Sequence, residues 1–119
     1  MSATSWFENV PNIPYEGPNS DNPLAFTHYN ADEMVAGKTM RDHLRFAVCY
    51  WHAMRGTGAD PFGVGCRSMP WSVADDEMQA AHQTMDAMFE FATKLGAPYW
   101  CFHDRDIAPE CDDLAETNA

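Results

Sequence analysis

Positive charge is scarce in this sequence. The 119 residues contain seven Lys and Arg against eighteen Asp and Glu, for a formal net charge of −11. Nucleic acid and anionic membranes are bound by basic surfaces, so we expect neither partner. No apolar run approaches the roughly 20 residues that span a bilayer. Residues 1–20 also lack the basic start and apolar core of a secretion signal, so we expect a cytoplasmic location.

The sequence also lacks cysteines and histidines at the spacing typical of a metal site. The four cysteines, Cys49, Cys66, Cys101 and Cys111, form no C-x-x-C pair, and no paired histidines accompany them. The pattern therefore does not predict a zinc site. Cys49 and Cys101 lie within apolar stretches, where a reduced cysteine typically behaves as a small buried hydrophobe. We expect both to be buried, and a cytoplasmic location favours free thiols over disulfides.

Hydrophobic residues make up 45% of the chain, enough for a folded core. Prolines are concentrated in residues 1–29, where they block regular helix and sheet. Aromatic residues in the same segment indicate an extended arm that packs on a larger body. Capping patterns predict two short helices after it, over 30–37 and 39–44. Residues 1–44 are thus predicted to be an N-terminal extension, and residues 45–119 a separate unit.

That second unit has a strand–helix–strand pattern. Residues 46–51 and 97–103 are apolar and aromatic, as in strands buried on both faces of a parallel sheet. Between them, apolar residues recur every three or four positions over 76–95, and Gly96 follows as a helix stop. We predict an α/β fold with a βαβ unit whose two strands are parallel. Such a unit normally belongs to a larger doubly wound or barrel domain.

Ionisable residues follow the second predicted strand. His103 and Asp106 are three positions apart at its C-terminal end, the edge where α/β proteins bind ligands. A tight turn would bring the carboxylate to the imidazole, fix its tautomer and stabilise its protonated form. His103 would then be a positioned proton donor or acceptor. The alternative is a surface strand end on which both side chains are merely solvated.

A glycine-rich loop over 56–65 follows the first predicted strand. It opens no helix, has no lysine to reach a phosphate and lies in acidic surroundings, which excludes a nucleotide site. Phe62 is at the tip of this loop. It either folds back on the body of the protein or contacts a partner.

Many short motifs occur in one order along nearly the whole chain, from about Trp6 to Asn118. They are Tyr15-Glu-Gly, Asn22-Pro-Leu-Ala-Phe, His28-Tyr-Asn, Ala36-Gly-Lys-Thr-Met, His43-Leu-Arg-Phe-Ala, Tyr50-Trp-His, Gly58-Ala-Asp-Pro-Phe-Gly, Pro70-Trp, Phe89-Glu-Phe, Lys94-Leu-Gly and Cys101-Phe-His-Asp-Arg-Asp-Ile-Ala-Pro. In these motifs the sequence resembles the N-terminal part of the xylose isomerases, of the longer class with an N-terminal extension.

The resemblance implies that residues 45–119 are the first βαβ unit of a (β/α)8 TIM barrel, incomplete in this chain. It implies isomerisation of D-xylose to D-xylulose and of D-glucose to D-fructose. His103 would assist ring opening of the aldose, and Asp106 would orient it. Trp51 would line the sugar site, and Phe62 would complete the site of a neighbouring subunit in a homotetramer.

The resemblance also implies two divalent metal ions, Mg, Mn or Co, that assist a hydride shift in the complete enzyme. Their ligands would come from later strands, so we expect none from this chain and no activity from the chain alone. Two function classes stay open. The chain is either an enzyme fragment that needs the remainder of the barrel, or a non-catalytic interaction module derived from a xylose isomerase.

Overall fold

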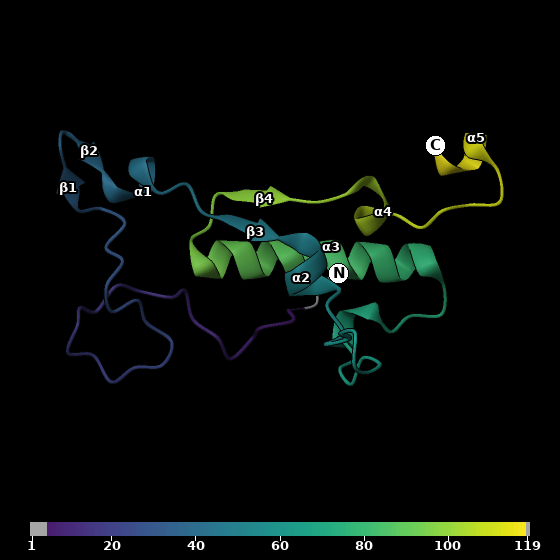
Figure 1. The fold of residues 1–119 in the computed structure, drawn as a ribbon, viewed down its shortest axis with the longest axis horizontal. Helices are drawn as coiled ribbons and strands as arrows, with labels where there is room; N and C mark the ends of the chain where they lie inside the picture. Colours follow the sequence, from purple (N-terminus) through teal and green to yellow (C-terminus); the bar gives the residue numbers. More distant parts are fainter. Residues whose placement is uncertain (1–4, 119) are drawn as a thin grey trace.

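Two short parallel strands and one long helix form the centre of the structure (Figure 1), a computed structural model that describes residues 5–118. Strand β3 (Ala47–Cys49) pairs in parallel with β4 (Tyr99–Cys101), and α3 (Glu77–Leu95) precedes β4. This confirms the predicted βαβ order and the parallel pairing. Residues 1–4 and 119, at the ends of the two predicted segments, lie outside the described residues.

Helix α3 begins and ends where the sequence predicts. The Asp76 carboxylate accepts a hydrogen bond of 2.7 Å from the backbone N–H of Gln79, which satisfies one donor of the first turn. At the other end, Gly96 has φ 75°, and its N–H bonds to carbonyls of the last turn. A left-handed backbone there favours glycine, because residues with a side chain rarely adopt a positive φ.

The core lies between α3, the strands and two short elements, α2 (Tyr50–Met54) and the 3₁₀ turn η1 (Pro70–Ser72). The Trp71 ring is buried, and its Nε1 donates a hydrogen bond of 2.9 Å to the Met54 carbonyl. This bond joins η1 to α2 while the ring covers α3. The buried side chains of this region are Val48, Tyr50, Met54, Met69, Trp71, Thr84, Ala87, Met88 and Ala92.

The expectation of strands buried on both faces is wrong within the described residues. Val48 points toward α3 and is buried, whereas Ala47 on the other face is exposed. Cys101 is likewise exposed and Cys49 only half-buried, so neither is the buried hydrophobe predicted. All four cysteines have free thiols. The first strand is also shorter than predicted, since the chain turns into α2 at Tyr50.

The N-terminal arm packs against the C-terminal half of α3, as its aromatic residues indicate. The Glu90 carboxylate accepts hydrogen bonds from the Ser5 hydroxyl and the Trp6 N–H, both 2.7 Å, and pairs with Lys94 at 2.9 Å. The Phe7 ring lies 5.5 Å from Trp71, centroid to centroid. One helix carboxylate therefore anchors the backbone of the arm, and aromatic contacts surround it.

The helix predicted over 30–37 is replaced by a hairpin. Strands β1 (Met34–Val35) and β2 (Lys38–Thr39) are antiparallel, and the two residues between them, Ala36 and Gly37, have φ 48° and 82°. Positive φ at both turn positions matches the twist of a tight hairpin and is incompatible with a right-handed helix. The second predicted helix is confirmed as α1 (Met40–His43).

The described chain is more extended than a compact domain. Its radius of gyration is 17.5 Å, against about 13–14 Å expected for a domain of this length. The hairpin with α1 lies at one end, and the small helix α5 (Leu114–Thr117) at the other, each away from α3 (Figure 1). No helix within residues 5–118 has the length and apolar character needed to cross a membrane. This shape is compatible with part of a larger domain.

We predict that acid releases the arm through Glu90. Hydrogen bonds from Ser5, Lys94 and Trp6 lower the pKa of its carboxyl from 4.5 to about 2. A lowered pKa in the folded state means that the stabilisation is complete above pH 4.5 and is lost as pH falls to about 2. Exchange of the Trp6 and Phe7 amides with solvent should accelerate over that window. Glu90→Gln should remove this pH dependence, whereas Glu8→Gln, at an exposed arm position, should leave it. Unchanged exchange rates of these amides at pH 2 would contradict the role of Glu90 as the anchor of the arm.

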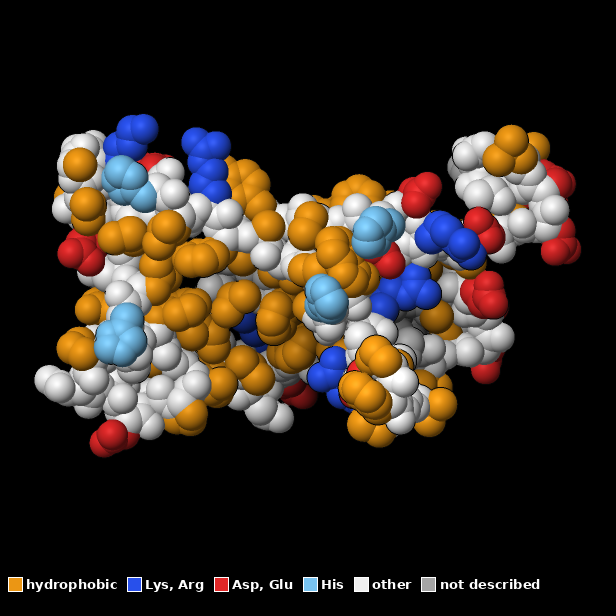
Figure 2. All heavy atoms as spheres, viewed as in Figure 1, with side chains coloured by type: hydrophobic (Ala, Val, Ile, Leu, Met, Phe, Trp, Pro, Cys, Tyr) orange, Lys and Arg blue, Asp and Glu red, His pale blue; other side chains and the backbone are white. Residues whose placement is uncertain are grey.

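We also predict that the purified chain self-associates or is loosely packed. An apolar groove of ≈ 510 Å³ between the arm, β3 and the end of α3 is lined by Phe26, Tyr29, Phe46, Phe91 and Leu95, among others. Figure 2 shows hydrophobic side chains spread across this face. Exposed apolar surface beside open sheet edges favours association. Light scattering should show species above 13.4 kDa. A monomer with one cooperative thermal transition would show that the unit is self-sufficient.

Candidate functional site

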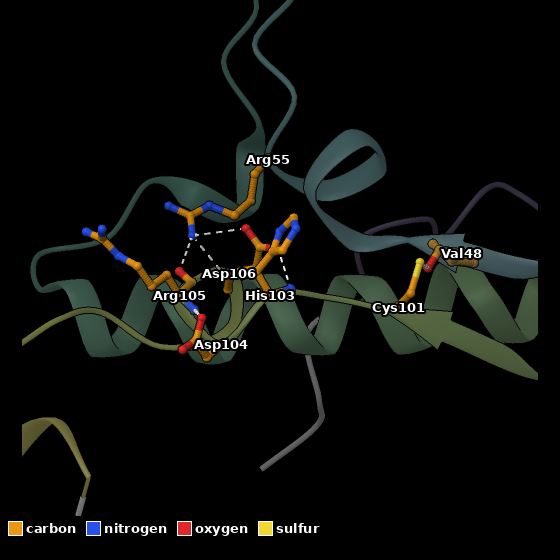
Figure 3. Close-up of polar contacts among 7 residues, drawn as sticks. All are labelled: Val48, Arg55, Cys101, His103, Asp104, Arg105 and Asp106. Atoms are coloured by element: carbon orange, nitrogen blue, oxygen red, sulfur yellow. Dashed lines mark hydrogen bonds and ion pairs between the residues drawn. The ribbon is translucent and has the colours of Figure 1, made fainter.

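His103 and Asp106 are in contact at the end of β4 (Figure 3). The His103 Nδ1 lies 2.9 Å from Asp106 Oδ2, and the His103 backbone N–H donates to the same oxygen at 2.8 Å. His103 is the cap of the one-turn helix α4 (Asp104–Ile107), so a spacing of three residues returns Asp106 to the strand end. The tight turn predicted from the sequence is therefore present.

One residue of the pair is largely exposed, and the other is largely buried. The His103 side chain is 65% exposed, whereas that of Asp106 is 14% exposed. With Nδ1 bonded to a carboxylate, Nε2 is the ring nitrogen left for an external group. Nε2 accepts a proton in the neutral ring and donates one in the imidazolium. The geometry suits an oriented general acid or base.

Trp51 lies against this pair. Its ring centroid is 4.4 Å from that of His103, with the planes tilted by 40°. The sequence predicts Trp51 within the first strand, but it occupies the first turn of α2, immediately after β3. Since β3 and β4 are parallel, their carboxyl ends share one edge of the sheet, and that edge brings Trp51 to His103. An apolar ring and an ionisable ring thus form one surface.

Arg55 is a site residue that the sequence does not indicate. It follows α2, and its Nη1 donates hydrogen bonds of 2.7 Å to the Arg105 carbonyl and 3.3 Å to the Asp106 carbonyl. The same nitrogen lies 3.9 Å from Asp106 Oδ1. A guanidinium that bonds two successive carbonyls holds the α4 turn in place. No motif marks it, because the contact joins residues 50 positions apart.

Phe62 does not join this cluster. Its side chain is 96% exposed, which excludes folding back on the described body of the chain. Asp60 holds the loop tip, since its carboxylate accepts a hydrogen bond of 2.8 Å from the Phe62 N–H. The other alternative for this residue, contact with a partner, stays a prediction. The structure therefore brings together His103, Asp106 and Trp51, and leaves Phe62 facing outward.

A cleft of ≈ 790 Å³ is lined by Asp106 but not by His103. Its lining includes Arg55, Arg67, Glu77, Arg105 and Asp106, and neither His103 nor Trp51 is among the lining residues. Residues 5–118 contain no group of three or more His, Cys, Asp or Glu side chains that could hold a metal ion. The described site presents a histidine, a carboxylate and an indole.

Parallel strands joined through a helix place the described chain among α/β proteins, a class in which ligands commonly bind at the carboxyl edge of the sheet. No family model matches the chain. Curated proteins named xylose isomerase do: that of Caldanaerobacter subterraneus is 55% identical over 113 residues, 95% of this chain. Xylose isomerase 2 of Xanthomonas campestris is 54% identical over 116 residues, 98% of this chain. That of Rhodopirellula baltica is 55% identical over 113 residues.

The matches cover only part of each relative. The chain spans 26% of the length of all three proteins, about a quarter. It matches an N-terminal part of the xylose isomerases. The family resemblance drawn from the sequence motifs is thereby confirmed.

We predict that Arg55 positions the α4 turn. Arg55→Ala should remove the hydrogen bonds to Arg105 and Asp106 and destabilise the turn locally by about 1–2 kcal/mol, a range set by exposed, charge-assisted hydrogen bonds. Amide exchange should accelerate over 104–107 and stay slow within α3. Arg67→Ala, which removes a bidentate contact to the Gly56 carbonyl, is the matched control and should leave α4 unchanged. Equal effects of the two variants on α4 would argue against a positioning role.

Proposed function

We propose that this chain supplies the ring-opening part of a xylose isomerase active site. The activity would be the isomerisation of D-xylose to D-xylulose, and also of D-glucose to D-fructose. The proposal is carried by the contact of His103, Asp106 and Trp51 at one sheet edge. Sequence identity of 55% to proteins named xylose isomerase supports it. In the complete enzyme, β3, α3 and β4 would be the start of a (β/α)8 barrel.

The roles follow from the chemistry of a cyclic aldose. Ring opening breaks the bond between C1 and the ring oxygen, which requires a proton on that oxygen and loss of the proton from the C1 hydroxyl. His103 Nε2 would deliver the first proton or accept the second. Asp106 would hold the ring in orientation through Nδ1. The indole of Trp51 would form an apolar wall for the carbon face of the sugar.

The described residues do not fit the two divalent metal ions that the family resemblance implies. A Mg, Mn or Co site needs several oxygen or nitrogen ligands converging on one point, and residues 5–118 contain no such group. Ligands for these ions would have to come from outside the described residues. The contribution that we assign to this chain is proton transfer and sugar packing.

The exposure of Phe62 supports contact with a second subunit. An aromatic side chain with 96% of its surface exposed at a loop tip has little to stabilise it in the isolated chain. Buried in the site of a neighbouring subunit, as in the homotetramer that the resemblance implies, the ring would become an anchor of the interface. The alternative function, a non-catalytic module that docks on isomerase subunits, would use the same loop and the arm. An in-frame or frameshifted continuation in the DNA downstream would favour the enzyme-fragment alternative.

The catalytic proposal is tested in a chimera that joins this chain to the remaining part of the Caldanaerobacter enzyme. His103→Asn should lower turnover of cyclic sugar by about 10²–10⁴-fold, the usual effect of losing a positioned acid–base group. Metal affinity should be nearly unchanged. Asp106→Asn should have a milder effect, because the imidazole survives without its orienting charge. Turnover and the thermal midpoint are measured on the same samples.

Two exposed residues of α3 provide matched controls. His82→Asn and Asp86→Asn make the same chemical changes away from the site and should keep full turnover. If the catalytic assignment is wrong, the rates of the His103 and Asp106 variants will follow the folded fraction alone. Full activity in a stably folded His103→Asn chimera would overturn it.

A further inference from the structure

The Asp106 carboxylate has a charged or ionisable neighbour at each of its two oxygens (Figure 3). Oδ2 accepts a hydrogen bond of 2.8 Å from the His103 backbone N–H and lies 2.9 Å from His103 Nδ1. Oδ1 lies 3.9 Å from Arg55 Nη1. Only 14% of the Asp106 side chain is exposed, so water reaches little of it. The carboxylate is therefore held between a guanidinium and an imidazole.

The backbone that carries Arg55 is fixed to the core. Arg55 directly follows α2, whose last residue, Met54, is buried. The Met54 carbonyl accepts the hydrogen bond of 2.9 Å from the buried indole of Trp71. From this base, the Arg55 guanidinium donates to the Arg105 carbonyl at 2.7 Å and to the Asp106 carbonyl at 3.3 Å. The guanidinium therefore connects the turn that carries Asp106 to the packed core.

The bond from His103 to Asp106 decides which ring nitrogen carries the proton when the imidazole is neutral. A carboxylate can only accept a hydrogen bond, so the facing Nδ1 is the N–H donor and Nε2 is the acceptor left for an external group. Without a partner at Nδ1, the ring could carry its proton on either nitrogen. The orientation of the Asp106 carboxylate therefore selects the tautomer of His103.

We propose that Arg55 is a positioning residue for ring opening, because it holds Asp106 so that His103 keeps its proton on Nδ1 and presents Nε2 to the sugar. The proposal rests on the ring-opening role of His103 and Asp106 proposed above. Arg55 acts through Asp106 and does not need to touch the substrate. Its planar guanidinium suits this task, since one rigid group contacts both a carbonyl and a carboxylate oxygen of the same residue.

The first test reads the His103 tautomer by nitrogen-15 NMR of the full chain, labelled at histidine. Spectra are recorded in alkaline buffer, where imidazoles ordinarily carry no charge, in solution or on sedimented protein if the chain associates. His103→Asn identifies the His103 signals, and circular dichroism confirms that each variant keeps α3. The unmodified chain should show His103 mainly as the Nδ1–H tautomer. Arg55→Ala should lower that fraction, whereas Arg67→Ala, which removes a guanidinium bonded to Gly56 in the same cleft, should not.

The second test measures turnover in the chimera with the Caldanaerobacter enzyme. Arg55→Ala should lower kcat for cyclic sugar by up to about 10²-fold, the order of loss when a reacting group is slightly misplaced, with KM nearly unchanged. In an Asp106→Asn background the same substitution should cause no further loss, because Arg55 acts only through Asp106. Arg55→Lys should restore part of the rate, since the charge beside Oδ1 returns without the planar group.

Three results would overturn the positioning role. The first is an unmodified chain in which His103 is mainly the Nε2–H tautomer. The second is a folded Arg55→Ala chain with an unchanged Nδ1–H fraction. The third is an equal loss of turnover from Arg55→Ala with and without Asp106→Asn, as expected of a residue that only stabilises the fold. The tautomer measurement needs no turnover, so it tests Arg55 separately from the proposed function, which fails if a folded His103→Asn chimera keeps full activity.

Discussion

The parallel pairing of β3 with β4 is the constraint on which the rest of the structure depends. Parallel strands cannot be joined by a tight turn, so the chain must cross over through a long element. Helix α3 is that element, and its apolar stripe packs against Val48 and Tyr50. The same geometry gathers the two carboxyl ends at one edge. Trp51 and His103 meet there although they are far apart in the sequence.

The hydrophobic core brings the strand ends and the arm close to α3, and polar contacts then hold them in place. Asp106 accepts from both the backbone and the ring of His103, so one carboxylate ends the strand and orients the imidazole. Arg55 bonds the carbonyls of the same turn from across the sheet. Near the other end of α3, the Glu90 carboxylate likewise accepts a hydrogen bond from the backbone N–H of Trp6 in the arm. In each case a charged side chain satisfies backbone groups that have left regular secondary structure.

The exposed surfaces are consistent with a segment of a larger protein. One face of the sheet is open, Phe62 faces outward, and the radius of gyration exceeds that of a compact domain. The chain spans about a quarter of the xylose isomerases that it matches. A two-stranded sheet with one covered face normally needs further elements to bury the other. The barrel and the oligomer remain proposals that this surface supports.

The sequence by itself determined the features that local chemistry controls. The periodicity of 77–95 with its caps at Asp76 and Gly96 specifies α3, and the spacing of His103 and Asp106 specifies their contact. Only the tertiary structure decided the rest. The hairpin over 34–39 depends on a left-handed turn that capping signals do not reveal, and the role of Arg55 depends on a contact 50 residues away. The exposure of Cys101 depends on which face of the sheet α3 covers. Local propensity carries no information about such long-range packing.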